Sequence, residues 1–589
     1  MLAGGDFGDR LRKLAADGGI DPEQARRDAT GYLREMGASH DQRATAAWLR
    51  FGGWMLRAHD LVVDAEKLGQ LRALDRKHSL LFLISHRSYL DGFALPLVLQ
   101  HHGVSLPFMM GGTNLNFFPV NALARHSGIV YIRRSTARQP VYRLTLRSYI
   151  AELIRDGQNL GWSIEGGRTR TGKLRPPAYG ILRYVLDALD ASTDTDALII
   201  PVSVVYEQLH EVGLMTSEAT GGGKRPEDIR WLVNYARSQR HHLGRAYMDF
   251  GDPIAVRERL AELHVADPGG RHVVERVALD TMHRINRATP VTATAVVCVA
   301  MLAADRALSL GEVLATVAPL ARYIERRQWP VAGGASLTDR ATIRLTLQEL
   351  VSSGVLISYD GGTETIWDIG PRQHLVAAFY RNTLVHLLVD RAIGELALAR
   401  AAESPAAAQT AADESLRLRD LLKFDFFFPS RRDFVAEMRS ELGLIDPSGL
   451  WRLDDFGPQD ARRWLTQARP LVAPMVLRPF LDAYHVVADR LTEWDEDGDG
   501  FDEARFLDEC LRVGRQWAMQ RRLASAESVS LELFKPALQL ARHRDLVQST
   551  APGLFERRRA FAAEMRETIR LVDEIAHLAR LAPLAGAAA

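Results

Sequence analysis

The pair best suited to acid–base chemistry is His86 and Asp91, in the segment SHRSYLD (85–91). On an ideal α-helix, residues five apart point roughly 140° away from each other, so the two side chains could not meet there. A strand-to-helix turn would bring them together, and the apolar run SLLFLIS (79–85) predicts a strand just before the histidine. We therefore predict that His86 is a general base and that Asp91 fixes its tautomer. The chain has 18 histidines, so this pair alone leaves an ordinary surface loop as the alternative.

A second candidate site is the segment EGGRTRTGK (165–173), which follows the predicted strand LGWSI (160–164). Its glycines allow the backbone to approach a ligand closely, at Gly166, Gly167 and Gly172. Its cations stand within six residues, at Arg168, Arg170 and Lys173. Because a guanidinium matches phosphate oxygens with two parallel hydrogen bonds, the segment predicts a phosphate or other anion site. The alternative is a solvated basic turn.

A third basic group, Arg133-Arg134, ends the predicted strand GIVYI (128–132). The carboxyl ends of parallel strands share one edge of a sheet, where α/β proteins bind ligands. We expect these arginines, the cations of 165–173 and His86 to converge on that edge. Two surface arginines without a ligand remain the alternative.

Two better-known motifs are each incomplete in this region. The spacing from Gly167 to Gly172-Lys173 fits a phosphate-binding P-loop, but Leu174 stands where Ser or Thr must hold Mg²⁺. A serine nucleophile elbow is excluded at Ser163, because Glu165 occupies the position of the required second glycine. We therefore expect neither nucleotide hydrolysis nor a covalent serine intermediate.

The elements that position these residues change character along the chain. Residues 1–75 predict a helical N-terminal region, from apolar residues at three- and four-residue spacing. Residues 76–290 alternate short apolar runs, including ALIIPVSVV (197–205), with helical stretches. That alternation predicts an α/β domain with a mixed, largely parallel sheet flanked by helices.

The rest of the chain predicts mostly helices. Residues 291–370 read as two helices followed by a hairpin near Asp360-Gly361-Gly362, which is typical of a winged-helix-like module. Its second helix, ATIRLTLQELVSSG (341–354), carries a single basic residue, Arg344. A winged-helix DNA-binding regulator needs more cations than that, so we favour a packing module and expect no nucleic-acid partner. Residues 371–589 predict a helical C-terminal domain, with an exposed linker at 401–413.

Composition narrows the class of protein. The 589 residues carry a formal net charge of +1, so an anion site must come from a local cluster of basic residues. Cys298 and Cys510 are too few and too far apart for a disulfide framework, and we expect buried reduced thiols in a cytosolic compartment. No N-terminal signal peptide is predicted, and the apolar run at 291–304 is shorter than the roughly 20 residues that span a bilayer.

Taken together, these segments resemble the glycerophospholipid acyltransferase family, and its glycerol-3-phosphate acyltransferase branch most closely. HRSYLD matches the HxxxxD block, and three further blocks follow in order, at GIVYIRRS (128–135), SIEGGRTRTGK (163–173) and IIPVSVVYE (199–207). Two more segments are similar to bacterial members, namely GGTNLNFFP (111–119) and LLKFDFFFPS (421–430). The clear resemblance covers about residues 80–255.

The resemblance implies roles for individual residues. His86 would be the base and Asp91 its partner, while Glu165, Gly166 and Gly167 would shape the site, and Pro201 would line the acyl or acceptor pocket. The acceptor phosphate would be held by basic residues, at Arg134, Arg168 and Arg170, with Arg133 and Lys173 beside them. The resemblance implies no metal and no cofactor.

The implied reaction is acyl transfer from acyl-CoA or acyl carrier protein to the sn-1 hydroxyl of glycerol 3-phosphate, which gives lysophosphatidic acid. The large C-terminal region and the form EGGRTRTGK favour this acceptor over the alternatives, which are dihydroxyacetone phosphate and lysophosphatidic acid. Because the product is a lipid and no spanning segment is predicted, we expect peripheral binding to the cytoplasmic side of the cell membrane.

Overall fold

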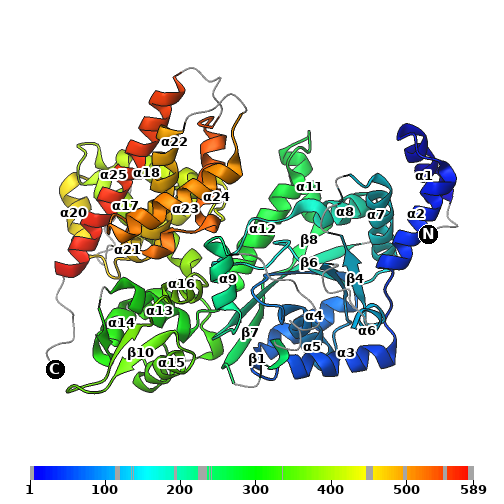
Figure 1. The fold of residues 1–589 in the computed structure, drawn as a ribbon, viewed down its shortest axis with the longest axis horizontal. Coiled ribbons are helices and arrows are strands. Elements are labelled where there is room, and N and C mark those ends of the chain that lie inside the picture. Colours follow the sequence, from blue (N-terminus) through cyan, green and yellow to red (C-terminus); the bar gives the residue numbers. More distant parts are fainter. Residues whose placement is uncertain are drawn as a thin grey trace. The chain divides into compact units, whose positions relative to one another are not determined.

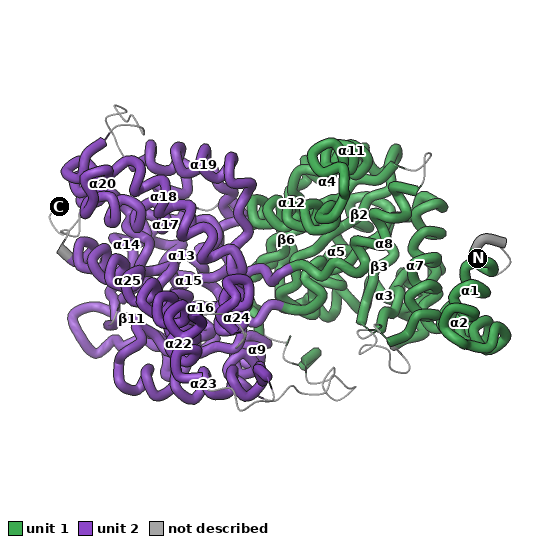
Figure 2. The backbone as a smooth tube through the Cα atoms, turned by 90° about the horizontal axis from the view of Figure 1, so that it is seen from above, with its two compact units in different colours: residues 1–168, 177–210, 225–289 green, residues 169–176, 211–224, 290–589 purple. Residues whose placement is uncertain are grey.

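The computed structural model describes most of the 589-residue chain, namely residues 5–112, 120–133, 136, 138–191, 196–222, 235–237, 239, 242–304, 306–334, 336–445, 456–494, 500–547 and 553–581. The chain divides into two compact units (Figure 2). Unit 1 comprises residues 1–168, 177–210 and 225–289, and unit 2 comprises residues 169–176, 211–224 and 290–589. The finer boundaries expected near residues 75, 290 and 370 stay predictions.

Unit 1 is built on an eight-stranded sheet with the order β1-β7-β6-β2-β5-β3-β4, in which β8 also pairs with β6 (Figure 1). The strands are β1 (Asp60–Val63), β2 (Ser79–Ile84), β3 (Phe108–Gly112), β4 (Ile129–Ile132), β5 (Leu160–Ser163), β6 (Ala197–Tyr206), β7 (Arg245–Phe250) and β8 (Ile254–Ala255). Strands β6, β2, β5, β3 and β4 run parallel, whereas β7 and β8 are antiparallel to β6. The carboxyl ends of the five parallel strands therefore share one edge.

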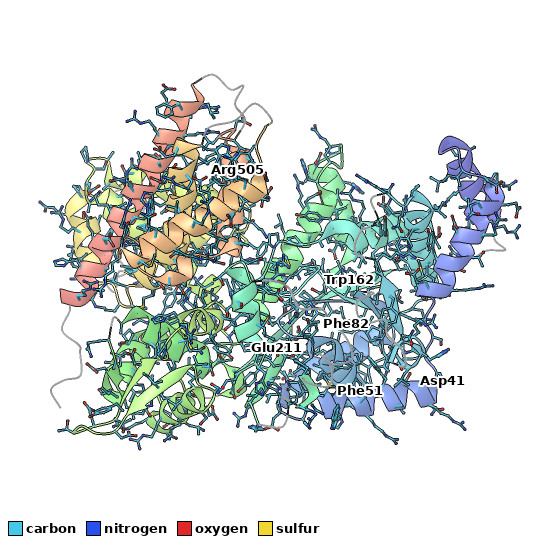
Figure 3. All side chains as sticks on the ribbon, in the orientation of Figure 1. Asp41, Phe51, Phe82, Trp162, Glu211 and Arg505 are labelled. Carbon is cyan, nitrogen blue, oxygen red and sulfur yellow. The ribbon has the colours of Figure 1, made fainter. Side chains whose placement is uncertain are left out.

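The centre of this sheet is apolar on both faces. Every residue of β2 and of β6 is buried, which explains why their sequences are continuous apolar runs and do not alternate. Phe82 of β2 and Trp162 of β5, labelled in Figure 3, are among the large side chains that are almost fully buried. The predicted mixed, largely parallel sheet flanked by helices is confirmed.

The described part of unit 1 also contains helices. They are α1 (Gly5–Asp17), α2 (Pro22–Met36), α3 (Gln42–Met55), α4 (Ala65–Asp75), α5 (Asp91–His101), α6 (Val120–Arg125), α7 (Pro140–Arg155), α8 (Tyr179–Asp190), α11 (Val256–Ala266) and α12 (Val273–Ala288). In Figure 1, helices α7, α8, α11 and α12 lie on one face of the sheet and α3, α4, α5 and α6 lie on the other. Helix α3 packs against α5, the helix that begins with Asp91.

Two local expectations for unit 1 need revision. The N-terminal 75 residues are not all helical, because Asp60–Val63 forms β1 and pairs in parallel with β7. The run Leu61-Val62-Val63 is rich in β-branched residues, and the distant strand β7 gives it a partner that the local pattern could not reveal. Strand β3 also went unpredicted, because it contains Gly111 and Gly112, which are weak strand formers.

Unit 2 is predominantly helical, as predicted. Its helices are α9 (Val212–Ala219), α13 (Ala293–Ala303), α14 (Leu310–Arg326), α15 (Arg340–Ser352), α16 (His374–Arg381), α17 (Val385–Ala401), α18 (Ala407–Leu422), α19 (Arg431–Gly443), α20 (Pro458–Gln467), α21 (Ala473–Val476), α22 (Arg478–Glu493), α23 (Glu503–Met519), α24 (Leu531–His543) and α25 (Leu554–Leu581), with short 3₁₀ turns at Ala332–Gly334 and Ala526–Ser528.

The segment expected to form a winged-helix-like module contains the predicted hairpin. Strands β10 (Leu356–Tyr359) and β11 (Ile366–Ile369) are antiparallel, and β9 (Leu308–Ser309) adds a third strand that is too short to show in the sequence. Asp339 caps α15, since its carboxylate accepts a hydrogen bond from the Thr342 backbone N–H at 2.8 Å. The winged-helix assignment itself stays a prediction.

The exposed linker expected at 401–413 is wrong. The chain turns briefly after α17 and is helical again from Ala407, with Ala407 and Ala411 buried. Alanine is the strongest helix former, and here the small side chains pack inward. Cys298 and Cys510 are both buried, and burial raises the pKa of the Cys298 thiol to about 12. Within the described ranges, no helix combines the length and apolar character needed to cross a bilayer.

Candidate active site

The candidate site begins where β2 ends. The Ser85 backbone N–H donates to the Val202 carbonyl at 2.9 Å, and the Ser85 hydroxyl accepts from the Val204 N–H at 3.0 Å. These two bonds hold the end of β2 against β6. The chain then turns, and α5 starts at Asp91, so His86 lies in the predicted loop between strand and helix.

His86 and Asp91 are hydrogen-bonded in that loop. The Nδ1 atom of His86 lies 3.0 Å from Oδ2 of Asp91. The Asp91 side chain is 4% exposed and the His86 side chain 27% exposed. A carboxylate is an acceptor, so Nδ1 carries the proton and Nε2 is the nitrogen that can accept one. The geometry expected from the sequence is present.

Asp91 is held in place by three further donors. Its Oδ2 atom accepts from the backbone N–H groups of Arg87 and Ser88, at 2.7 and 2.9 Å. Its Oδ1 atom accepts from the Tyr206 hydroxyl at 2.7 Å. Because these donors come from the loop and from the end of β6, the carboxylate cannot rotate without losing several bonds. Asp91 therefore presents a fixed acceptor to His86.

Glu165 links this loop to the end of β5. Its Oε1 atom accepts from the His86 backbone N–H at 2.8 Å, and the residue is buried. The neighbouring Arg87 guanidinium is also buried and donates to the Val204 carbonyl at 2.6 Å. Burial lowers the pKa of Arg87, while the charges of Glu165 and Asp91 raise it. These buried groups fix the backbone on which the imidazole stands.

The backbone conformation at position 166, directly after Glu165, requires a glycine. Gly166 has a φ of +64°, in the left-handed region, and a Cβ there would come within 2.9 Å of the Ala178 Cβ. A side chain would both strain the backbone and collide with its neighbour. Gly167, the next residue, is half-buried. The tight turn lets the chain leave β5 and reach Arg168.

Arg168 is the cation of this loop that lies in unit 1. Its Nη2 atom donates to the Tyr89 hydroxyl at 2.5 Å, and its Cζ atom lies 3.5 Å from the centroid of the Tyr89 ring. Tyr89 in turn packs edge-to-face on Tyr235, with 5.8 Å between the ring centroids. Because Tyr89 belongs to the HRSYLD segment, the structure ties the predicted cation to the loop that carries the predicted base.

Arg133 is already paired within unit 1. Its Nε and Nη2 atoms donate to the two carboxylate oxygens of Glu35, at 2.9 and 2.6 Å, and its Nη1 donates to Gln139 at 3.0 Å. The guanidinium also lies near the rings of Tyr32 and Tyr142. The bond to Glu35 raises the pKa of Arg133. This arginine joins the end of β4 to α2.

Arg134 lies outside the described residues. So do residues 113–119, which form most of the segment GGTNLNFFP.

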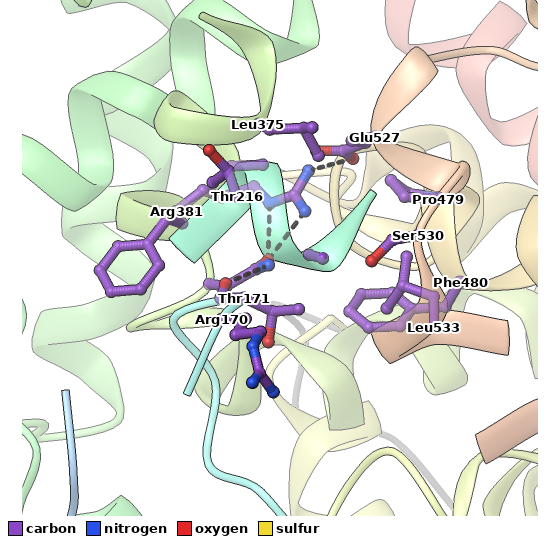
Figure 4. A pocket seen from close by; sticks show the side chains of 14 residues that line it. Arg170, Thr171, Thr216, Leu375, Arg381, Pro479, Phe480, Glu527, Ser530 and Leu533 are labelled. Carbon is purple, nitrogen blue, oxygen red and sulfur yellow. Dashed lines mark hydrogen bonds and ion pairs between the residues drawn. The ribbon is translucent and has the colours of Figure 1, made fainter. Parts of the chain in front are cut away.

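Arg170 belongs to unit 2, where two carboxylates pair with it. Its Nε donates to Glu218 at 3.0 Å and its Nη1 to Glu532 at 3.1 Å. Figure 4 shows Arg170 among the side chains that line a small pocket of unit 2. Every residue that lines this pocket lies in unit 2, whereas His86 and Asp91 lie in unit 1. Its two glutamates already neutralise the guanidinium that the sequence predicted for phosphate.

Lys173 is likewise committed to unit 2. Its Nζ donates to the carboxylate and to the backbone carbonyl of Asp425, and its side chain is 10% exposed. The other carboxylate oxygen of Asp425 accepts from the Tyr484 hydroxyl at 2.6 Å. This pair joins two of the segments on which the resemblance rests, EGGRTRTGK and LLKFDFFFPS. In the structure, these two segments are joined by the buried ion pair of Lys173 and Asp425.

Pro201 lies in the middle of β6, opposite Leu83 of β2, and is buried. Its carbonyl accepts from the Gly251 N–H at 2.8 Å. Proline has no N–H for a sheet ladder, and on this flank of β6 it falls between the residues that pair with β8 and those that pair with β7. The structure therefore places Pro201 in the sheet.

Two models of known protein families match this chain. The family model described as the glycerol-3-phosphate acyltransferase C-terminal region matches residues 215–550, and the model described as acyltransferase matches residues 64–205. The first match alone spans more than half of the 589 residues. The chain belongs to the glycerol-3-phosphate acyltransferase family. It is an acyltransferase, and His86 and Asp91 fall within the matched acyltransferase segment.

Relatives of this acyltransferase include a Mycobacterium tuberculosis protein named "Putative acyltransferase plsB1", 54% identical over 582 residues that cover 98% of this chain and 93% of the relative. A glycerol-3-phosphate acyltransferase of Aeromonas hydrophila is 28% identical over 493 residues, which cover 80% of this chain and 59% of the relative. The solved 1-acyl-sn-glycerophosphate acyltransferase PlsC of Thermotoga maritima covers 47% of this chain and 92% of its own, at 15% identity and a TM-score of 0.25.

The structure adds residues to the acyltransferase site that sequence reasoning missed. Tyr206 holds Asp91, and Tyr89 holds Arg168. Tyr206 also packs edge-to-face on the buried imidazole of His59, at 5.2 Å between centroids. The available signal for Tyr206 was its polar hydroxyl at the end of a buried and mostly apolar strand. For Tyr89 the signal was an aromatic residue inside the HxxxxD block.

Among the described residues, no group of three or more His, Cys, Asp or Glu side chains could hold a metal ion.

Proposed function

We propose that this acyltransferase moves a fatty acyl group from acyl-CoA or acyl carrier protein to the sn-1 hydroxyl of glycerol 3-phosphate, which gives lysophosphatidic acid. Family membership supports acyl transfer, and the name of the Aeromonas relative supports the acceptor. The single observation that carries the chemistry is the bond from His86 Nδ1 to Asp91 Oδ2 at 3.0 Å. A hydroxyl is a weak nucleophile at neutral pH and needs a positioned base of this kind.

In the proposed mechanism, Nε2 of His86 removes the hydroxyl proton while the oxygen attacks the thioester carbonyl. Asp91 stabilises the imidazolium that forms and, with Tyr206 and the loop amides behind it, keeps the ring in one orientation. The tetrahedral intermediate then collapses, the carbon–sulfur bond breaks, and the departing thiolate takes the proton from His86. No covalent enzyme intermediate is involved.

Arg168 is the proposed principal contact for the acceptor phosphate. Its guanidinium lies in unit 1 on Tyr89, three residues after His86 in the sequence. We propose Arg134 as a second contact, from its place in the GIVYIRRS block. For Arg133, Arg170 and Lys173 we now propose structural roles, because each is already paired with a carboxylate. Glu165, Gly166 and Gly167 then shape the loop between base and phosphate.

The proposal includes peripheral binding to the cytoplasmic face of the cell membrane. The substrate phosphate is soluble, but the product carries a fatty chain and belongs in a bilayer. A catalytic site at a lipid surface would release that product directly into its destination.

One assay tests the proposal. Purified protein is given palmitoyl-CoA with glycerol 3-phosphate, dihydroxyacetone phosphate, lysophosphatidic acid or glycerol, and release of free CoA is followed. We expect the highest kcat/KM with glycerol 3-phosphate and almost none with glycerol. The His86→Ala variant serves as the control for background hydrolysis. Preference for either other phosphate acceptor would replace the proposed acceptor, and no CoA release with any acceptor would overturn the proposed chemistry.

A further inference from the structure

Helix α3 presents an unusual surface to solvent. The stretch from Gln42 to His59, which includes all of α3, contains three arginines and no aspartate or glutamate. These are Arg43, Arg50 and Arg57, and all three are exposed. The whole 589-residue chain has a net charge of only +1, so this run concentrates positive charge far above the average.

Arg43 and Arg50 share one side of α3, and Arg57 follows two residues after the last residue of the helix, Met55. Residues seven apart on an α-helix are separated by only about 20° around the axis, so a seven-residue spacing forms a nearly straight row. Trp54 projects from the same side and is 49% exposed. The other exposed residues between them are small, at Ala46, Ala47 and Gly53. The small neighbours therefore leave the three arginines and the Trp54 indole accessible to a partner.

This row carries no carboxylate partner among the described residues. Arg57 lies over the Trp54 ring, with its Cζ 4.3 Å from the centroid, and it donates to the backbone carbonyls of Trp54 and Ala236. The aspartate nearest in sequence, Asp41, caps α3 through the Ala44 N–H at 2.9 Å. Figure 3 labels Asp41 and Phe51 on this helix. The charge of the row is therefore not neutralised within the chain that the structure describes.

The opposite side of α3 packs against α5, the helix that begins with Asp91. A Cβ at Gly52 would come within 3.2 Å of Phe93 on α5, so α3 and α5 pack closely at this point. Trp48 and Phe51 also contact the Phe93 ring, at 5.2 and 5.7 Å between centroids. Phe93 lies two residues after Asp91. Arg43, Arg50 and Trp54 therefore lie on a helix that packs directly against α5, whose first residue is Asp91.

We propose that the exposed row of Arg43, Arg50, Trp54 and Arg57 docks this enzyme on an anionic lipid surface. Arginines near an anionic bilayer gain electrostatic attraction, and tryptophan favours the boundary between headgroups and acyl chains. The inference rests on the proposed function in one respect, since a lipid product calls for a membrane-facing site. It goes further because it names the surface that makes the contact.

The observations favour a lipid surface over an acidic protein such as acyl carrier protein. The helical part of the row, from Arg43 to Trp54, is about 17 Å long and has small residues between its cations, which suits a flat and laterally mobile field of charge. Protein interfaces are instead built on a buried apolar centre that is depleted of charge. Here Trp54 is the single large apolar side chain among the exposed residues of α3.

The test is co-sedimentation of the full-length protein with vesicles of phosphatidylcholine, with or without phosphatidylglycerol. The variants are the triple substitution Arg43→Gln/Arg50→Gln/Arg57→Gln and the single substitution Trp54→Ala. The double substitution Arg43→Gln/Arg50→Gln spares the hydrogen bonds of Arg57, so it keeps the test usable if the triple variant misfolds. The matched control removes three exposed arginines elsewhere in unit 1, through Arg72→Gln/Arg76→Gln/Arg143→Gln.

We expect the triple variant to bind phosphatidylglycerol vesicles about 100-fold more weakly, since each basic residue near an anionic bilayer contributes roughly a fivefold gain. The control triple should bind as the unsubstituted protein does. Without vesicles, CoA release from a short-chain acyl-CoA and glycerol 3-phosphate should stay unchanged in both triple variants. If the unsubstituted protein bound vesicles but released no CoA, that result would count against the proposed function and not against the docking surface. Equal vesicle binding by the two triple variants would overturn the docking surface. A triple variant that loses affinity only for acyl carrier protein would reassign it to that partner.

Discussion

The guanidinium of Arg168 lies over the ring of Tyr89, with its Cζ atom 3.5 Å from the ring centroid. The ring attracts the cation and the phenol oxygen accepts its hydrogen bond, so Tyr89 restricts Arg168 in both position and orientation. Because Tyr89 stands three residues after His86, the distance from proposed base to proposed phosphate contact depends on one short loop.

Replacement of Tyr89 should therefore act on acceptor binding. Tyr89→Leu removes the ring and should raise the KM for glycerol 3-phosphate roughly tenfold, with little change in kcat, since a cation over an aromatic ring is stabilised by about 0.5–2 kcal/mol. Tyr89→Phe keeps the ring and should have a smaller effect. Steady-state kinetics with varied acceptor measure both. If the two variants behaved alike, the ring contact would have no part in acceptor binding.

Loss of Arg168 itself should weaken acceptor use more strongly. Removing one partner of a close charge pair costs roughly 2–5 kcal/mol, so Arg168→Ala should lower kcat/KM for glycerol 3-phosphate by more than about tenfold. The KM for acyl-CoA should change far less. Arg170→Ala provides the comparison, because Arg170 is paired with Glu218 and Glu532. A larger kinetic loss in Arg170→Ala than in Arg168→Ala would exchange the roles that we propose for them.

The proposed catalytic pair, His86 and Asp91, predicts a graded loss of activity. His86→Ala should lower kcat by roughly 10²–10⁴-fold, which is the usual contribution of a positioned base. Asp91→Asn should lose most activity, because an amide can present an N–H to Nδ1 and hold the ring in the wrong tautomer. Circular dichroism spectra should match those of the unsubstituted protein. Near-normal turnover in His86→Ala would remove the base from the mechanism.

The buried pair of Lys173 and Asp425 predicts a stability effect in unit 2. Lys173→Met would leave the Asp425 carboxylate buried, with the Tyr484 hydroxyl as its one remaining side-chain partner among the described residues. Breaking one side of a buried ion pair typically costs about 3–5 kcal/mol. Urea denaturation should show that loss, and Lys173→Met/Asp425→Leu should recover part of it. If the double substitution were no more stable than the single one, the ion pair would not be the source of the loss.

His59 predicts a loss of stability in mild acid. Burial lowers its pKa from 6.5 to about 4, so the folded protein keeps the imidazole neutral where the unfolded chain binds a proton. The stability that the neutral ring contributes is therefore complete above about pH 6.5 and falls as the pH drops towards 4, by roughly 3 kcal/mol. His59→Gln should flatten this part of the profile. Unfolding midpoints of both proteins between pH 7 and pH 4 provide the measurement.

The parts of the site that the sequence predicted are those set by near neighbours in the chain. His86 and Asp91 are five residues apart, and a strand followed by a helix was enough to place them together. Tyr206 and Glu165 reach the same loop from β6 and β5, and their contacts depend on strand order, which no local pattern encodes.

The segment EGGRTRTGK (165–173) shows most clearly what could not be predicted from the sequence. Arg168, Arg170 and Lys173 look equivalent in sequence, yet they have different partners. Arg168 contacts Tyr89 in unit 1, whereas Arg170 pairs with Glu532, 362 positions away, and Lys173 with Asp425, 252 positions away. The different partners of these three cations therefore depend on residues far away in the chain, which no local pattern connects with them.

The passage of the chain from Arg168 in unit 1 to Thr169 in unit 2, and back at Pro177, bears on how this enzyme can be divided. A fragment ending at residue 289 would retain every strand from β1 to β8, but residues 169–176 would lose Asp425 and Glu532. The part of the chain that carries His86 and Asp91 therefore cannot be separated from the rest without loss of these contacts. Exchange of the C-terminal half between relatives would succeed only if the incoming half brought carboxylates that pair with the cations of residues 169–176. We therefore expect the two halves to have been inherited together.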